Sequence, residues 1–120
     1  MKKETEKWLL KAKEDLADAE FNINGGHNSL GVFMLQQALE KALKALHIEN
    51  FGKYEFTHNL VRLSSKFNTP DKFQKTFEEL TPVYTGFRYP DISEGEIEEP
   101  EGKLFSTKEI IEWIEKQLIK

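Results

Sequence analysis

The stretch NSLGVFMLQQALEKALKALHI, residues 28–48, decides the fold class of this chain. Its apolar residues recur at helical spacing but cover more than the single stripe that one buried face requires. Asn28 or Ser29 is a suitable N-cap, because a short polar side chain can accept a hydrogen bond from the first turn. We therefore predict a helix from this cap to about Ile48 that lies at the centre of a bundle and packs on more than one side.

The preceding segment predicts a second long helix, from Glu4 to Asn24. Gly25-Gly26 is expected to end it, because glycine adopts the left-handed conformation at low steric cost. One apolar stripe runs down this segment at steps of four, four, three and four residues: Trp8, Ala12, Leu16, Ala19 and Ile23.

Three further helices are expected downstream. A short one opens near Thr57 or His58, and another begins at Pro70 and is kinked or shortened by Pro82, which has no amide hydrogen to donate. A roughly twenty-residue segment without periodicity, residues 85–104, separates them from a last helix with a capping box at Ser106–Glu109. The sequence predicts an all-α, up-and-down bundle of about five helices, with a long acidic loop before the last helix and no sheet.

Length and composition limit the class of protein. The 120 residues fit a single domain spanning 1–120, and the absence of cysteine excludes disulfides, thiolate zinc sites and a cysteine nucleophile. The sequence has no apolar run of membrane-spanning length and no signal-peptide core near Met1, so we expect a cytoplasmic protein without membrane contact. No cofactor is expected.

The formal net charge of −4 arises from one segment. Residues 91–101 contain six acids and no base, and the rest of the chain has 15 acids and 17 bases. The remaining surface is compatible with an anionic ligand such as a nucleotide, but it lacks the basic footprint of a DNA-binding protein.

A polar row follows one edge of the expected central helix. Gln36, Glu40, Lys44 and His47 recur at steps of four, four and three residues. One interpretation is a solvated face in which Glu40 and Lys44 form a favourable i,i+4 pair. The other is a row that lines a groove, because polar groups on a largely apolar helix need partners when they are buried.

Outside this row, His58 and the segment around Arg88 are the candidates for chemistry. His58 is either an ordinary helix-start residue or an acid, base or phosphate contact, since imidazole titrates near neutral pH. Arg88, Tyr89 and Asp91 lie in the segment FRYPD, where Arg88 could bind a phosphate and Tyr89 could stack on a base. They could equally form a structural corner, with Arg88 paired to Glu40 or Asp91. The three histidines lack metal-ligand spacing, so no metal site is expected.

Taken in order, several blocks of this chain resemble the HEPN domain over nearly its whole length. The blocks are Trp8 with Ala12, Asp15-Leu16 and Ala19; QQALEKALKA at residues 36–45; His58-Asn-Leu60 with Leu63; FRYPD at residues 87–91; and a closing helix with Trp113. The resemblance implies a homodimer and kinship with the helical domain of kanamycin nucleotidyltransferase. It further implies a partner, a minimal nucleotidyltransferase encoded nearby, often in a toxin–antitoxin pair.

Many HEPN proteins are ribonucleases that use an arginine followed about four to six residues later by a histidine, and this chain departs from that pattern. Ser93, Glu94 and Gly95 stand after Arg88, with Ile92 at the short end, and Phe67, Asn68 and Thr69 stand after Arg62. We therefore expect a non-catalytic protein that binds a nucleotide or a nucleotidyltransferase partner. Its expected nucleotide-binding residues are Gln36, Glu40, Lys44, His58, Arg88, Tyr89 and Asp91. The alternative is a degenerate ribonuclease toxin that uses His58 with Arg88.

Overall fold

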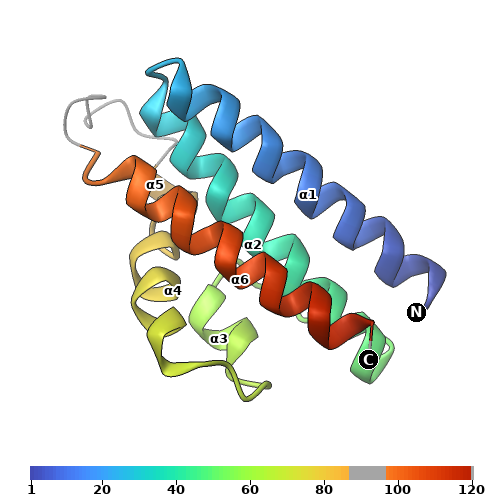
Figure 1. Ribbon diagram of the computed structural model, residues 1–120. Coiled ribbons are helices and arrows are strands. Elements are labelled where there is room, and N and C mark those ends of the chain that lie inside the picture. Colours follow the sequence, from blue (N-terminus) through green and yellow to red (C-terminus); the bar gives the residue numbers. More distant parts are fainter. Residues whose placement is uncertain (87–96, 120) are drawn as a thin grey trace.

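The computed structural model describes residues 1–86 and 97–119, and this part of the chain is all-α (Figure 1). Its elements are α1 (Lys3–Asn24), α2 (Asn28–Phe51), α3 (Leu60–Ser64), a 3₁₀ turn η1 (Asp71–Phe73), α4 (Gln74–Leu80), α5 (Val83–Gly86) and α6 (Pro100–Leu118). The predicted all-α fold class is confirmed, whereas most of the acidic loop predicted before the last helix lies outside the described residues.

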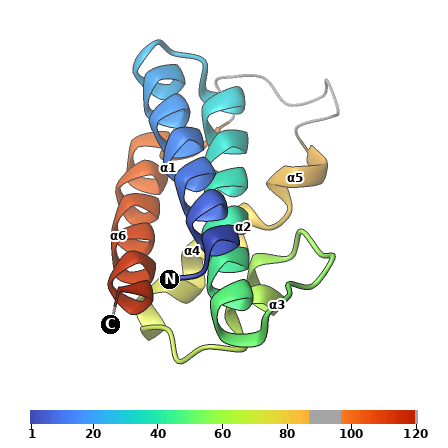
Figure 2. The same ribbon diagram turned by 90° about the vertical axis from the view of Figure 1, so that its right-hand side faces the viewer.

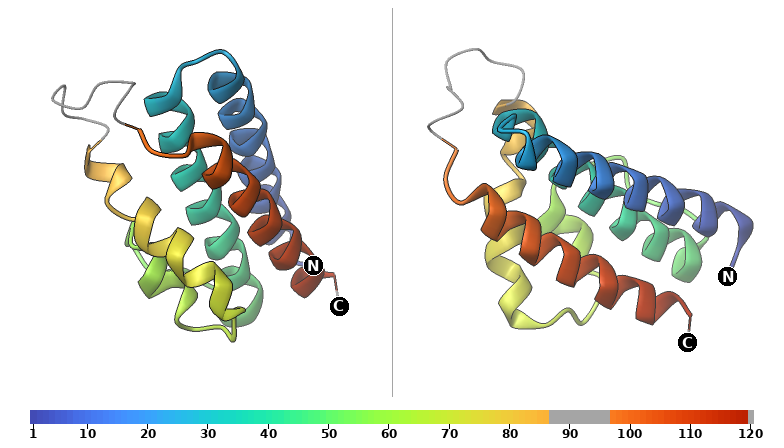
Figure 3. Two further views of the ribbon diagram at one scale, coloured as in Figure 1. Left: turned by 60° about the vertical axis from the view of Figure 1, so that its left-hand side comes forward. Right: turned by 45° about the horizontal axis from the view of Figure 1, so that its top comes forward.

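The three long helices lie side by side, and the short ones cover the remaining side of α2 (Figure 2). Both chain ends lie at the same end of the bundle (Figure 3). Contacts join α2 to every other α-helix of the described chain, as its wide apolar surface predicted. Its leucines Leu35, Leu39 and Leu43 are completely buried in the common core.

The α1–α2 hairpin is closed by a glycine turn. Gly26 has a φ of +84°, the left-handed conformation predicted for this pair of glycines. Just beyond the turn, Gly31 lets α2 approach α1 closely: a Cβ atom built there would lie 2.5 Å from Ile23 Cγ1 and 3.2 Å from the Ala19 carbonyl oxygen. No side chain caps α2, whose N-cap is His27, so neither Asn28 nor Ser29 has the predicted role.

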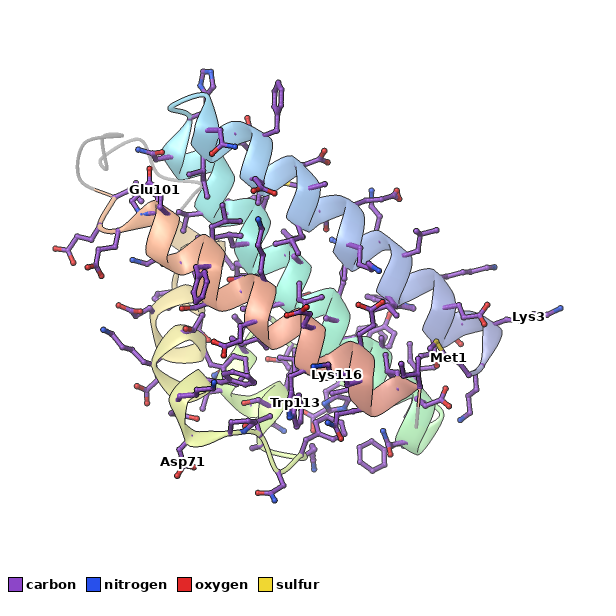
Figure 4. All side chains as sticks on the ribbon, in the orientation of Figure 1. Met1, Lys3, Asp71, Glu101, Trp113 and Lys116 are labelled. Carbon is purple, nitrogen blue, oxygen red and sulfur yellow. The ribbon has the colours of Figure 1, made fainter. Side chains whose placement is uncertain are left out.

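The last helix differs most from expectation. It begins at Pro100 rather than at Ser106, so the predicted capping box lies inside the helix. Proline suits the first helical turn, because its missing amide hydrogen would have no intrahelical partner there. Trp113 lies on the second half of α6 (Figure 4), and its ring meets that of Phe73 of η1 edge-on, with centroids 6.1 Å apart.

Two smaller expectations concern the middle of the chain. The helical segment predicted after Pro70 is interrupted around Pro82, where α4 ends at Leu80 and α5 begins at Val83, as the proline indicated. The N-cap of α3 is Asn59, one or two residues later than predicted, and its side chain accepts a hydrogen bond from the Arg62 amide at 3.1 Å.

Candidate functional site

The polar row of α2 is buried, so its interpretation as a solvated face is wrong. The exposed fractions are 0% for Gln36, 7% for Glu40, 5% for Lys44 and 2% for His47. The α2 segment predicted to be central is covered by short helices on this side, and these polar groups must therefore find partners within the protein.

Glu40 is the centre of the resulting network. Lys44 Nζ donates to Glu40 Oε2 at 2.9 Å, and Gln36 Nε2 donates to Oε1 at 2.9 Å. His58 Nδ1 lies 2.9 Å from Oε1 and 3.1 Å from Oε2. Three of the predicted site residues thus converge on the carboxylate of a fourth.

The pKa of Glu40 is lowered from its ordinary value of 4.5 despite its burial. Desolvation on its own would raise this pKa. Hydrogen bonds from Lys44, Gln36 and His58, together with the charge of Lys44, outweigh that effect. Glu40 is therefore ionised at neutral pH and holds the groups around it by charge-assisted hydrogen bonds.

His58 connects this buried network to the surface. Its side chain is 49% exposed, and its ring stacks on Tyr84 of α5 with centroids 3.7 Å apart and planes inclined by 14°. Gln36 Nε2 also donates to the His58 carbonyl oxygen at 3.3 Å, which fixes the backbone at this position. Because Glu40 occupies Nδ1, Nε2 is the ring nitrogen through which His58 can act on a ligand.

The network continues along α2 to the first helix. Gln37 Nε2 donates to Gln36 Oε1 at 2.6 Å, and Lys41 Nζ lies between Gln37 Oε1 at 3.4 Å and Asp15 Oδ2 at 2.6 Å. Asp15 is 3% exposed and belongs to α1. A line of hydrogen bonds thus links Asp15 of α1 to His58, and it orients the side-chain amides of Gln36 and Gln37.

The family model of the HEPN domain matches residues 5–117. This chain belongs to the HEPN family. The match spans nearly all of the long helices and the whole polar network just described, in agreement with the resemblance seen in the sequence.

Solved structures support the same placement. The chain is similar to ST0689, an archaeal HEPN homologue, with 27% identity, 98% of this chain and 99% of that chain covered, and a TM-score of 0.77. It is also similar to the HEPN domain protein TM0613 from Thermotoga maritima, with 27% identity, 94% and 98% coverage, and a TM-score of 0.68.

A third structure and the curated proteins add less about function. TT1696 from Thermus thermophilus has the same fold, with a TM-score of 0.85, 24% identity, and 98% and 100% of the two chains covered. No curated protein matches the chain.

Within this HEPN domain, four of the predicted site residues meet and three cannot be placed. Gln36, Glu40, Lys44 and His58 form one hydrogen-bonded group. Arg88, Tyr89 and Asp91 lie outside the described residues, as does the predicted pairing of Glu40 with Arg88.

Two tyrosines belong to this neighbourhood that the sequence analysis did not assign to it. Tyr84 stacks on His58, and Tyr54 lies under the Lys44 ammonium, which is 5.0 Å from the ring centroid. The four-residue step from Leu80 to Tyr84 indicated only a shared helix face. Nothing in the sequence signalled that this face meets His58.

Two classes of site find no support in residues 1–86 and 97–119. No group of three or more histidine or acidic side chains there is arranged to hold a metal ion. In the same residues, no helix is both long enough and apolar enough to cross a membrane.

Proposed function

We propose that this HEPN domain protein binds a nucleotide without transforming it, as the partner of a minimal nucleotidyltransferase. The observation that carries the proposal is the half-exposed His58 ring, held by Glu40 at 2.9 Å and stacked on Tyr84. A stacked aromatic pair offers a platform for a base, and the imidazolium form of His58, with its Nδ1–H on Glu40, offers its Nε2–H to a phosphate oxygen.

The charged residues of the proposed site have two different roles, one structural and one in ligand binding. The Lys44 side chain is buried and its ammonium is committed to Glu40, which leaves little support for its expected role as a phosphate-binding cation. Arg88 and Tyr89 follow Gly86, the last residue of α5, by two and three positions. In the proposal, Arg88 supplies the phosphate-binding charge, Tyr89 a pocket wall and Asp91 a partner for Arg88, while Glu40 and Gln36 hold His58 in place.

A titration of the ¹⁵N-labelled protein with ATP tests nucleotide binding. We expect the amide signals of Gln36, Glu40, His58, Tyr84 and Arg88 to shift together and saturate. The variant His58→Ala should weaken binding by at least about tenfold, because one hydrogen bond to a charged group contributes about 1.5–3 kcal/mol.

Phe56→Ala is the matched control, because Phe56 is an aromatic residue that is 92% exposed and contributes no contact to His58 among those described. It should leave ATP binding unchanged. Shifts scattered over the surface, or no shift at millimolar ATP, would remove the nucleotide-binding proposal.

The partner is tested separately. If the neighbouring reading frame encodes a short nucleotidyltransferase, co-expression should yield a complex that co-elutes in size-exclusion chromatography. Separate elution of the two purified proteins would refute the partnership and leave nucleotide binding to be judged by the titration.

One observation favours a second candidate, the degenerate ribonuclease toxin that uses His58 with Arg88. A carboxylate bound to one imidazole nitrogen is the arrangement that orients a histidine general base, and Glu40 and His58 have it. Against this candidate stand the missing arginine–histidine spacing and the acidic residues of the 91–101 segment, which repel a polyanion.

We therefore expect the purified protein to leave total RNA intact. Incubation of the wild type and His58→Ala with total RNA, followed by gel electrophoresis, is the measurement. Cleavage by the wild type that disappears in the variant would establish the ribonuclease instead.

A further inference from the structure

The fourth member of the polar row, His47, takes no part in the Glu40 network. Its Nε2 lies 2.9 Å from the Leu63 carbonyl oxygen and therefore donates a hydrogen to it. This bond fixes the ring inside an aromatic group at the C-terminal end of α2. The ring meets Phe51 and Phe67 edge-on, at 5.7 and 5.2 Å between centroids, while Phe51 and Phe67 stack on each other at 5.9 Å.

A pocket of about 280 Å³ opens beside this aromatic group, between α2, the 53–55 segment and the residues after α3. It is lined by His47, Phe51, Lys53, Tyr54, Glu55 and Lys66. Ligand pockets in proteins are typically about 300–1,000 Å³, so this one is suited to a small molecule with one or two rings. Three of its six lining residues are aromatic, His47, Phe51 and Tyr54, which favours a planar aromatic ligand.

The charge of the pocket specifies the rest of the ligand. Glu55 is the one acid in the lining, and Arg62 Nε binds its carboxylate at 2.6 Å. Lys66 Nζ is 3.8 Å from the same carboxylate, too far for a hydrogen bond, and Lys53 adds a second ammonium to the rim. With Arg62 engaged by Glu55, the lysines leave an excess of positive charge for an anionic group.

We infer that this pocket binds a small planar aromatic molecule bearing one anionic group, a carboxylate or a phosphate. The ring inserts against Phe51 and Tyr54, and the anion sits at the rim between Lys53 and Lys66. The site is separate from the one around His58 and does not depend on the proposed function. Tyr54 contacts both sites: it lines this pocket, and its ring centroid lies 5.0 Å from the Lys44 ammonium of the Glu40 network.

The experiment is a titration of the ¹⁵N-labelled full chain with 2-naphthoate, 2-naphthyl phosphate and the uncharged 2-naphthalenemethanol. At least one anionic probe should shift the amides of His47, Phe51, Tyr54 and Lys66 in a saturable way. The alcohol should bind at least about fivefold more weakly, as expected for the loss of one charge-assisted contact. The stronger of the two anionic probes identifies the head group as carboxylate or phosphate.

Three variants distinguish binding in this pocket from nonspecific binding to the protein surface. Lys66→Gln should weaken the anionic probe by about fivefold and leave the alcohol unchanged, because it removes one rim charge. Phe51→Ala, at a side chain that is half exposed, should weaken all three probes. Lys75→Gln, at an exposed lysine of α4, is the matched control and should change nothing.

The inference is overturned if no probe shifts these amides at millimolar concentration, or if charged and uncharged probes bind equally. It is also overturned if Lys66→Gln and Lys75→Gln behave alike. Because ATP binding at His58 is followed at other amides, its failure and the failure of this pocket would be distinguishable.

Discussion

At Glu40, one buried carboxylate satisfies an ammonium, an amide and an imidazole at distances of 2.9–3.1 Å. Removal of one member of a buried ion pair is costly, because the remaining charge is left in a poorly hydrated place. The carboxylate therefore has a structural role as well as its role in holding His58, and substitutions at this position test both.

Glu40→Gln should lower the free energy of unfolding by about 3 kcal/mol at neutral pH, since Lys44 then lacks its carboxylate. Urea denaturation measures this change. The double variant Glu40→Gln/Lys44→Met is the control, and it should recover much of the loss because no buried charge remains unpaired. Equal losses in the two variants would contradict the assigned role of the pair.

The lowered pKa of Glu40 also predicts how its stabilising contribution depends on pH. A carboxyl with a lower pKa in the folded state stabilises the protein above its unfolded-state pKa of 4.5, and this contribution disappears as pH falls through the folded value. The stability difference between wild type and Glu40→Gln should therefore shrink below about pH 4.5 in acid. A difference that stays constant from neutral pH into acid would contradict the prediction.

At the scale of the elements, the α1–α2 contact depends on the absence of a side chain at Gly31. An alanine Cβ there would overlap Ile23 Cγ1 at 2.5 Å and crowd backbone atoms of α1 at 3.2 Å. Ile23 is 3% exposed and has little room to move. The gain in helix propensity, about 1 kcal/mol, is smaller than the strain that overpacking produces.

Gly31→Ala should accordingly lower the free energy of unfolding by up to about 2 kcal/mol, the overpacking cost less the gain in helix propensity, measured by thermal or urea denaturation. Gly102→Ala in α6 is the matched control, because its Cβ would meet only Glu99 Cβ at an ordinary 3.6 Å. That substitution should be neutral or stabilising. Equal effects at the two glycines would show that helix propensity, not packing, governs both.

At the scale of the whole molecule, α1 and α6 each carry exposed apolar side chains. Leu10, Phe21 and Phe105 are 63%, 79% and 72% exposed, and a groove of about 650 Å³ that includes Phe105 and Leu16 runs between these helices. Ion pairs cross this groove, with Lys13 Nζ at 2.8 Å from Glu115 Oε2 and Lys108 Nζ at 2.6 Å from Glu20 Oε2. A surface of this kind is typical of protein interfaces.

We expect a homodimer that uses this face. Light scattering should give about twice the 14.0 kDa mass of one chain, and a standard interface would cover roughly 800 Å² per subunit. Phe21→Asp/Phe105→Asp should yield monomers, whereas Phe56→Asp, at another exposed aromatic, should not. A mass near 14 kDa at all concentrations would contradict dimer formation.

The sequence by itself determined the helices and the centrality of α2. Both follow from short-range properties: apolar spacing, a glycine pair at residues 25–26, and Pro82 without an amide hydrogen. The start of the last helix was predicted wrongly from the Ser106–Glu109 capping box, because helix length depends on what the added turns pack against.

Only the tertiary structure decided the character of the polar row. In the sequence, Gln36, Glu40 and Lys44 fit a solvated edge as well as a buried one, because spacing says nothing about what covers a helix. Short helices from later in the chain cover this edge and bring His58 and Tyr84 to it. The pKa of Glu40, the orientation of His58 and the separate role of His47 all arise from contacts between residues that are distant in the chain.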